Sequence, residues 1–193
     1  MFQVRIHGRG GQGVVTAAEL LSVAAFRAGK HAQAFPSFGS ERTGAPVVSF
    51  CRIADTPIRS HEPVAAPDAL IIQDVSLLGQ VDVLDGLAPG GFLLLNTLRT
   101  PQELGLGSAA AALPPGHLVT VHASELAMEH VGRPVPNVPL LGAFAALTGL
   151  ISLESVIVAL EERFAGPLAR SNSAAAEAAY ELVIKEAAHA AAG

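Results

Sequence analysis

A glycine-rich run near the start of the chain, Gly8-Arg9-Gly10-Gly11-Gln12-Gly13, constrains the fold more than any other stretch. Before it, residues 2–7 alternate between apolar and polar side chains, which predicts a β-strand. After it, residues 14–29 repeat apolar side chains at helical spacing and end on a glycine suited to a helix C-terminus. A strand, a tight glycine turn and a helix predict a phosphate-binding unit, because the helix N-terminus presents unpaired N–H groups.

Further predicted strands and helices follow in an order typical of an α/β protein. We expect strands over 31–35, 46–53, 57–59, 69–72, 91–96 and 118–121, and helices over 75–84, 123–130, 140–150, 153–164 and 171–190. Residues 100–115 are predicted to form a loop with one helical turn, and Ser171-Asn172-Ser173 to cap the last helix. The segments 46–53 and 57–59 would pair as a hairpin, which gives an antiparallel excursion near 46–59.

These elements predict an α/β fold of the Rossmann-like, three-layer kind, with a mostly parallel sheet and C-terminal helices. We expect a single domain over 1–193. Within it, about 1–125 would form the Rossmann-like sheet core and about 138–190 the helical C-terminal part.

The chain has few charged residues: they make up 15% of it, against 50% hydrophobic residues. Either partner subunits cover part of the surface, or the many alanines raise the apolar fraction without making the surface sticky, and composition leaves both open. The net charge of −5 and the lack of a basic run indicate no nucleic-acid binding. No apolar run reaches the ~20 residues of a membrane span and Met1 leads directly into a predicted strand, so we expect a cytoplasmic protein without a signal peptide.

The sequence offers few groups for catalysis, and we predict neither a catalytic residue nor a metal site. It has no G-x-S-x-G elbow, no Walker-type lysine after the glycines and no C-x-x-C pair. Cys51, the single cysteine, excludes an internal disulfide and a four-cysteine iron–sulfur cluster held by this chain alone, and its apolar strand predicts an inert core thiol. The histidines share no metal-ligand spacing, and His7 would either touch a ligand or lie at the surface. A phosphate cradle without catalytic residues indicates a part of a larger enzyme.

The end of the second predicted strand argues against a dinucleotide site. An NAD-binding unit places an acidic residue there, about 20 residues beyond the glycines. Here the strand runs into the loop 36–44, in which Glu41 is the nearest acid. The polar composition of this loop fits either a functional loop or a plain surface loop with a weak salt bridge. Asp74, Asn96 and Thr97 end or follow predicted strands, where they would face a ligand crevice or cap helices.

Two motifs together resemble one enzyme family. Gly8-Arg9-Gly10-Gly11-Gln12-Gly13-Val14, followed by Phe35-Pro36-Ser37-Phe38-Gly39-Ser40-Glu41-Arg42, resembles the gamma subunit of 2-oxoacid:ferredoxin (acceptor) oxidoreductases, of the pyruvate:ferredoxin oxidoreductase type. Residues 137–144 and Ser171-Asn172 are similar to the C-terminal helical part of that family, so the resemblance spans nearly the whole chain. The Phe35-Pro36-Ser37-Phe38 stretch favours the pyruvate-like branch over relatives that act on indolepyruvate.

The resemblance implies a complex that oxidatively decarboxylates a 2-oxo acid to an acyl-CoA and passes electrons to ferredoxin or another acceptor. Thiamine diphosphate with Mg²⁺ and the [4Fe–4S] clusters would lie on alpha, beta and ferredoxin-like delta subunits. This chain would contribute coenzyme A (CoA) binding and subunit assembly. The residues that the resemblance implies at the CoA phosphates are Gly8, Arg9, Gly10, Gly11, Gln12 and Gly13, with Ser37, Glu41 and Arg42 facing the CoA path or the partner subunits.

Two other interpretations stay open. One is a free-standing nucleotide- or CoA-binding module without redox partners. The other is an NAD(P)-dependent dehydrogenase, which the missing acidic residue and the absent catalytic set disfavour. The family also includes enzymes for 2-oxoglutarate, 2-oxoisovalerate, phenylglyoxylate and oxalate, the last of which does not use CoA, so the sequence fixes neither the 2-oxo acid nor the use of CoA.

Overall fold

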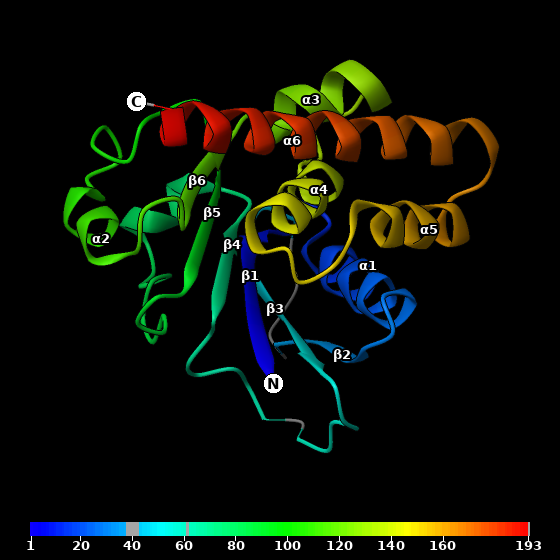
Figure 1. Ribbon diagram of the computed structural model, residues 1–193, viewed down its shortest axis with the longest axis horizontal. Helices are drawn as coiled ribbons and strands as arrows, with labels where there is room; N and C mark the ends of the chain where they lie inside the picture. Colours follow the sequence, from blue (N-terminus) through cyan, green and yellow to red (C-terminus); the bar gives the residue numbers. More distant parts are fainter. Residues whose placement is uncertain (38–42, 61, 193) are drawn as a thin grey trace.

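The computed structural model describes residues 1–37, 43–60 and 62–192. At its centre lies a six-stranded sheet with the strand order β2-β3-β1-β4-β5-β6 (Figure 1). The strands are β1 (Phe2–Arg9), β2 (His31–Pro36), β3 (Pro46–Ala54), β4 (Ala69–Ile72), β5 (Phe92–Asn96) and β6 (Leu118–Val121). Strands β1, β4, β5 and β6 pair in parallel, whereas β3 runs antiparallel to both β1 and β2. The predicted mostly parallel sheet with an antiparallel excursion is therefore confirmed.

The long helices gather on one face of this sheet. The described helices are α1 (Val14–Arg27), the 3-10 helix η1 (Val75–Gly79), α2 (Gly107–Ala112), α3 (Ala123–Val131), α4 (Asn137–Thr148), α5 (Leu153–Arg163) and α6 (Gly166–Ala192). Figure 1 shows α6 spanning the molecule, with α4 between α6 and the sheet and α5 beside α1. This arrangement confirms the predicted C-terminal helices.

The alternation of side chains along the strands produces two hydrophobic clusters, one on each face of the sheet. On the first face, strand residues such as Ile6 and Ile71 pack with α1 and α4, and Phe144 is 1% exposed there. On the second face, Leu70 and Leu93 pack under η1 and irregular segments of the chain. The third layer of the fold is therefore built from η1, α2 and irregular segments rather than from long helices.

Buried arginines fasten the irregular segments to the second face. Arg5 in β1 is 8% exposed, and its guanidinium donates hydrogen bonds to the carbonyl oxygens of Val64 (3.4 Å), Val83 (3.2 Å) and Asp85. The guanidinium of Arg52 in β3 likewise donates hydrogen bonds to the carbonyl oxygens of Ser60 (3.3 Å) and Glu62, in the loop that follows β3. Because a buried carbonyl group needs a hydrogen-bond partner, these guanidinium groups replace the strand neighbours that such loops lack.

Two predicted elements on the second face are wrong. The strand predicted over 57–59 and its hairpin with 46–53 are wrong: β3 pairs with β1 and β2 instead. The loop that follows is held by its Ser60 and Glu62 carbonyl groups, which accept hydrogen bonds from the Arg52 side chain rather than from a neighbouring strand. The helix predicted over 75–84 is shortened to the 3-10 helix η1. The chain then turns so that Val83, 2% exposed, packs against the sheet.

The last helices begin earlier than predicted. Helix α4 starts at Asn137 rather than at 140, because Pro139 lies in its first turn, where a missing N–H costs no hydrogen bond. Helix α6 starts at Gly166, so Ser171-Asn172-Ser173 lies inside it, and the predicted cap is wrong. Close packing of α6 on α4 outweighs the preference of these residues for a helix end. Asn172, 6% exposed, donates from its side-chain amide to Leu168 O one turn earlier in α6 (2.9 Å).

Candidate functional site

The glycine turn begins where β1 ends, at the carboxyl edge of the parallel strands. Gly10 N donates to Ala45 O (2.9 Å) and Gly44 N donates to Gly10 O (3.0 Å), which ties the turn to the chain before β3. Gly11 and Gly13 have φ angles of 98° and 70°, in the left-handed region that favours glycine. Gly13 is also the N-cap of α1. The predicted strand, turn and helix are therefore confirmed.

The N-terminus of α1 is left open by its own sequence. Gly13 has no side chain to cap the helix, and the first turn carries no acidic residue. The first N–H groups of the helix, those of Val14, Val15 and Thr16, have no acceptor within the helix. A Cβ added to Gly11 would meet nothing within 4 Å, so the backbone is open there as well. This end of α1 offers N–H donors and a partial positive charge to an anion.

Two other glycines of the run, Gly8 and Gly13, allow close packing. A Cβ at Gly8 would overlap Val14 Cγ2, and a Cβ at Gly13 would overlap the side-chain amide of Asn137 in α4. The Asn137 Nδ2 group lies 3.4 Å from Gly13 O. Gly8 thus brings β1 close to α1, and Gly13 brings the turn close to α4.

The two side chains of the turn point to the start of η1. Arg9 Nε donates to Asp74 Oδ2 (3.1 Å), and Gln12 Nε2 donates to the same oxygen (3.0 Å). Arg9 Nη2 donates to Ser76 Oγ (2.7 Å), and Arg9 Nη1 donates to Gly44 O (3.0 Å). Gln12 Oε1 accepts from Arg9 N at 2.8 Å. Much of the hydrogen-bonding capacity of Arg9 is therefore used within the protein.

The polar residues at the other strand ends accept hydrogen bonds from nearby backbone N–H groups. Asp74 Oδ1 accepts from the N–H of Ser76 at the start of η1 (3.0 Å). Asn96 Oδ1 accepts from Ser124 N in the first turn of α3 (3.1 Å), and Thr97 Oγ1 accepts from Arg99 N (3.0 Å). Capping is thus the predicted role that the geometry bears out for Asp74 and Asn96, whereas Thr97 bonds within a turn and caps none of the described helices. Burial tends to raise the pKa of the Asp74 carboxyl, but hydrogen bonds from Ser76 and the charge of Arg9 outweigh it and lower that pKa.

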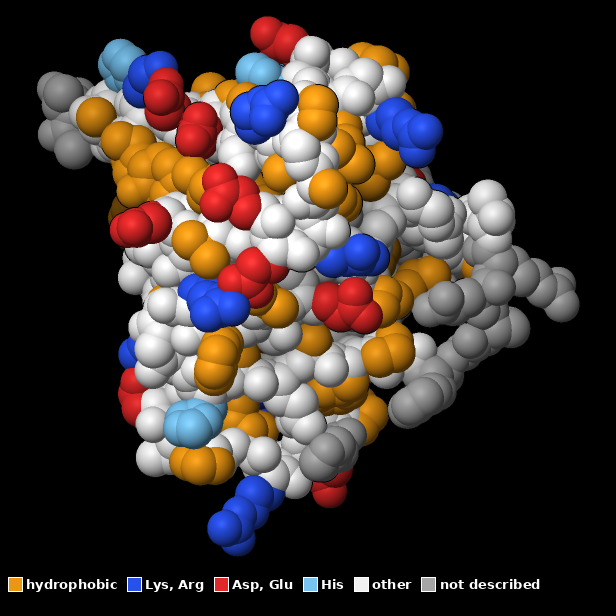
Figure 2. Space-filling view, turned by 90° about the vertical axis from the view of Figure 1, so that its right-hand side faces the viewer, with side chains coloured by type: hydrophobic (Ala, Val, Ile, Leu, Met, Phe, Trp, Pro, Cys, Tyr) orange, Lys and Arg blue, Asp and Glu red, His pale blue; other side chains and the backbone are white. Residues whose placement is uncertain are grey.

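A cleft of about 280 Å³ opens beside the glycine turn. Gly11, Gly13 and Thr16 line one side, and residues from α3, α5 and α6 line the other. Its cationic side chains are Arg133 and Arg163, both exposed, and neither makes an ion pair within the described residues. The sequence analysis missed both arginines, because they lie more than a hundred residues after the turn and stand in no recognisable motif. Figure 2 shows the face that carries α5, where blue and red side chains stand among apolar groups.

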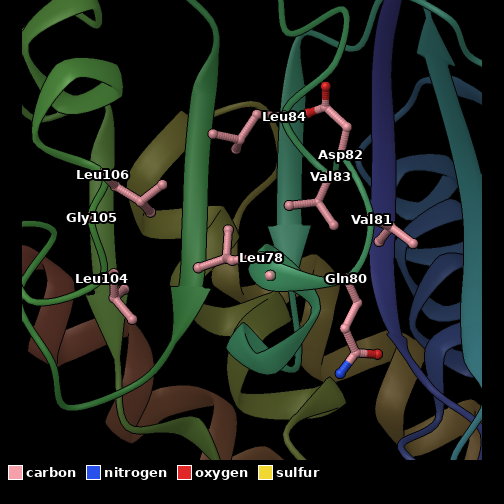
Figure 3. A pocket seen from close by; sticks show the side chains of 10 residues that line it. Leu78, Gln80, Val81, Asp82, Val83, Leu84, Leu104, Gly105 and Leu106 are labelled. Atoms are coloured by element: carbon pink, nitrogen blue, oxygen red, sulfur yellow. The ribbon is translucent and has the colours of Figure 1, made fainter.

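A larger hollow of about 450 Å³ lies on the second face (Figure 3). Residues 78–84, from the end of η1 and the segment after it, line one part, and residues 104–106 line the rest. Figure 3 shows leucine and valine side chains along it, with Asp82 as its charged side chain. Because this lining holds a carboxylate and no cation, it does not suit a phosphate. We therefore place the candidate site at the glycine turn.

His7 and Cys51 lie outside this site. His7 is 6% exposed on the second face, and its Nε2 accepts a hydrogen bond from Arg5 Nε at 3.0 Å. The predicted surface position of His7 is wrong, because the ring is a buried partner of Arg5. Burial and the charge of Arg5 lower the pKa of His7 to about 4. Cys51 is fully buried and burial raises the pKa of its thiol, which agrees with the predicted inert core thiol.

The loop after β2 is described in part. Ser37 is exposed, and its N–H donates to Val48 O at 2.9 Å. Glu41 and Arg42, which the resemblance implies at the site, lie outside the described residues. Thr43 forms a bridge to Gly10, so the end of this loop adjoins the turn.

Together, the sheet, the open helix end and the cleft beside it define a Rossmann-like α/β protein with a glycine turn at the N-terminus of α1. The family model described as pyruvate ferredoxin/flavodoxin oxidoreductase matches residues 3–182 of the chain. The chain is 46% identical over 184 residues to the pyruvate/ketoisovalerate oxidoreductases common subunit gamma of Thermococcus kodakarensis, with coverage of 95% of this chain and 98% of the relative. It is 47% identical over 181 residues to pyruvate synthase subunit PorC of Methanothermobacter marburgensis, with coverage of 94% and 97%. The chain therefore belongs to this oxidoreductase family, as a gamma-type subunit.

Solved structures agree with this assignment. The crystal structure of pyruvate oxidoreductase subunit PORC from Thermotoga maritima aligns with a TM-score of 0.79 and 35% identity, covering 93% of this chain and 95% of that one. A 2-oxoglutarate:ferredoxin oxidoreductase from Magnetococcus marinus shares the fold with a TM-score of 0.70 at 19% identity, and there the match covers 31% of the other chain. Among the described residues, no helix is long and apolar enough to span a membrane.

Proposed function

We propose that this gamma-type subunit binds the phosphate groups of CoA at the glycine turn, within an enzyme that converts a 2-oxo acid to an acyl-CoA. The observation that carries this proposal is the uncapped N-terminus of α1, which faces open space at Gly11 and adjoins a cleft with Arg133 and Arg163. Unpaired N–H donors and two cations together favour a ligand with several negative charges.

The residues present fit such a ligand. The N–H groups of Val14, Val15 and Thr16 would bind phosphate oxygens, and the guanidinium groups of Arg133 and Arg163 would neutralise further charge. CoA supplies a thiol that accepts the acyl group, and this chain would hold and orient its phosphates. Arg9 has a smaller part in this proposal than the resemblance implies, because Asp74, Ser76 and Gly44 occupy much of its guanidinium.

The other parts of the enzyme would belong to partner chains. We propose alpha, beta and ferredoxin-like delta subunits that carry thiamine diphosphate with Mg²⁺ and the [4Fe–4S] clusters, with ferredoxin or another acceptor taking the electrons. Pyruvate or a branched 2-oxo acid is the proposed substrate class, because the relatives at 46% and 47% identity are named as subunits of pyruvate/ketoisovalerate oxidoreductases and pyruvate synthase. The 2-oxoglutarate oxidoreductase that shares the fold was solved with coenzyme A bound, which makes CoA the first ligand to test.

Substitution of Gly11 tests the proposed cradle. In the assembled enzyme, Gly11→Ala should raise the Kd for CoA by about ten-fold, because an alanine at φ 98° forces the turn out of its shape. Isothermal titration calorimetry with CoA measures this change. The melting temperature of each complex reports on folding separately.

Gly29→Ala is the matched control for this experiment. Gly29 also has a positive φ, 80°, and a Cβ there meets nothing within 4 Å, but it follows the opposite end of α1. We expect the control to lose a similar amount of stability and to bind CoA as the wild type does. Equal CoA affinity in the two variants would contradict the proposed site.

A further inference from the structure

The glycine turn has few means of holding its own shape. Within it, Gln12 N donates to Arg9 O at 3.0 Å, and four of the six residues of the run 8–13 have no side chain. Arg9 and Gln12 are the two residues of the run 8–13 that carry side chains. Both reach out of the turn to a single carboxylate, that of Asp74, 65 and 62 positions further along the chain.

Every oxygen of that carboxylate has two donors. Oδ2 accepts from Arg9 Nε and Gln12 Nε2, whereas Oδ1 accepts from the backbone N–H of Ser76 (3.0 Å) and from Ser76 Oγ (2.6 Å). Ser76 Oγ in turn accepts from Arg9 Nη2. The capping of η1 and the tethering of the glycine turn therefore depend on the same side chain.

Arg9 extends this network to the other side of the turn. Its Nη1 donates to Gly44 O, and Gly44 N donates to Gly10 O. A displaced Arg9 side chain would thus disturb the backbone of the turn through Gly44 as well as through Asp74. Hydrogen bonds to an ionised group are stronger than those between neutral groups, so this network can fix a glycine-rich segment.

We propose that Asp74 is a positioning residue: its carboxylate holds Arg9 and Gln12, and so keeps the glycine turn in the conformation that receives the ligand. This inference rests on the proposed CoA site and assigns a role to a residue that does not touch the ligand. Arg9, the charged side chain of the turn, then binds Asp74 rather than the ligand.

The test is Asp74→Asn in the assembled enzyme. Asparagine keeps the shape but has one neutral acceptor oxygen, so it cannot accept hydrogen bonds from Arg9, Gln12 and Ser76 together. We expect the Kd for CoA, measured by isothermal titration calorimetry, to rise about ten-fold, and the KM for CoA to rise with it. The KM for the 2-oxo acid should stay within two-fold of the wild type. Asp74→Glu keeps the charge and should recover part of the affinity.

Asp55→Asn is the matched control. Asp55 Oδ1 accepts from Lys30 Nζ at 2.6 Å, but this exposed pair lies at the other end of the sheet, so CoA binding should not change. If Asp74→Asn prevents assembly, Ser76→Ala removes the hydroxyl that Asp74 and Arg9 share, and it should weaken CoA binding several-fold.

The outcomes separate this inference from the function on which it rests. Normal CoA binding by Asp74→Asn, together with weak binding by Gly11→Ala, overturns the role of Asp74 alone. A variant that loses affinity for CoA and the 2-oxo acid equally also overturns it, because that result indicates general damage. A wild-type enzyme that binds no CoA overturns both the site and the positioning role.

Discussion

His7 shows at the residue scale how a buried neutral side chain makes stability depend on pH. Its Nε2 accepts from Arg5 Nε, so protonation would remove an acceptor and place two positive charges side by side. The pKa of His7 is lowered to about 4, whereas a histidine in an unfolded chain titrates near pH 6.5. Below pH 6.5 the unfolded state takes up a proton that the folded state does not, so stability falls as the pH falls toward 4.

Replacing His7 should remove this pH dependence. Between pH 7 and pH 5, His7 contributes a loss of about 2 kcal/mol in the free energy of unfolding, which His7→Gln should lack because a glutamine side chain takes up no proton. Glutamine still offers Arg5 an acceptor oxygen. Urea unfolding of the purified chain at both pH values measures the difference. His31→Gln, on an exposed side chain of β2, should behave as the wild type does. A wild-type and a His7→Gln chain with the same pH dependence would contradict this explanation.

Sequence reasoning found the backbone of the site but not the partners of its side chains. Gly11 and Gly13 were predictable because a strand, a turn and a helix impose a local geometry on neighbouring residues. The contact between Arg9 and Asp74 depends on the parallel pairing of β1 with β4, which local patterns do not specify. For the same reason Arg133 and Arg163 could not be assigned to the cleft before the C-terminal helices were placed.

At the scale of elements, α4 and α6 approach one another more closely than side chains normally allow. A Cβ at Gly142 in α4 would overlap the carbonyl oxygen of Ala176 in α6. Ala175, Ala176 and Ala179 are fully buried. Several alanines of the C-terminal sequence are therefore buried in α6, and this packing explains why α6 includes Ser171-Asn172-Ser173, residues of types that usually precede a helix.

Gly142→Ala should destabilise the chain by about 2 kcal/mol or more, because a backbone carbonyl cannot move aside as a side chain can. Chemical unfolding followed by circular dichroism gives the free energy. Gly107→Ala in α2 is the matched substitution: a Cβ there meets nothing within 4 Å, so alanine should stabilise by up to about 1 kcal/mol. Opposite signs for the two variants would support the close approach of α4 and α6, and a neutral Gly142→Ala would refute it.

At the scale of the whole molecule, charged residues make up only 15% of the chain, and the fold supports both explanations of this low share. Part of the alanine content is buried between α4 and α6, so it adds nothing to the surface. Large apolar side chains nevertheless remain exposed on several elements, and they include Phe26, Leu98, Met128, Leu168 and Ile184. Such exposure fits a chain that contacts other subunits, although single exposed apolar residues also occur on monomers.

Native mass spectrometry of the enzyme from its own cells tests this view. We expect the chain in a complex with larger subunits that carry thiamine diphosphate and iron. The exposed apolar residues would then be covered, and Phe26→Ser or Leu98→Ser should weaken assembly without changing the fold of the chain. A chain that stays monomeric in the lysate would favour the free-standing binding module instead.

The position of β1 has a consequence for the order in which the chain folds. Strand β1 lies in the sheet between β3 and β4, and Arg5 bonds to carbonyl groups 59, 78 and 80 residues further on. On the ribosome, β1 emerges before the strands with which it pairs. Arg5 can form its hydrogen bond to Asp85 O only after residue 85 has emerged as well. Forming contacts between residues so far apart in the sequence slows folding. Within residues 1–85, strand β1 should therefore be the last segment to become protected from hydrogen exchange.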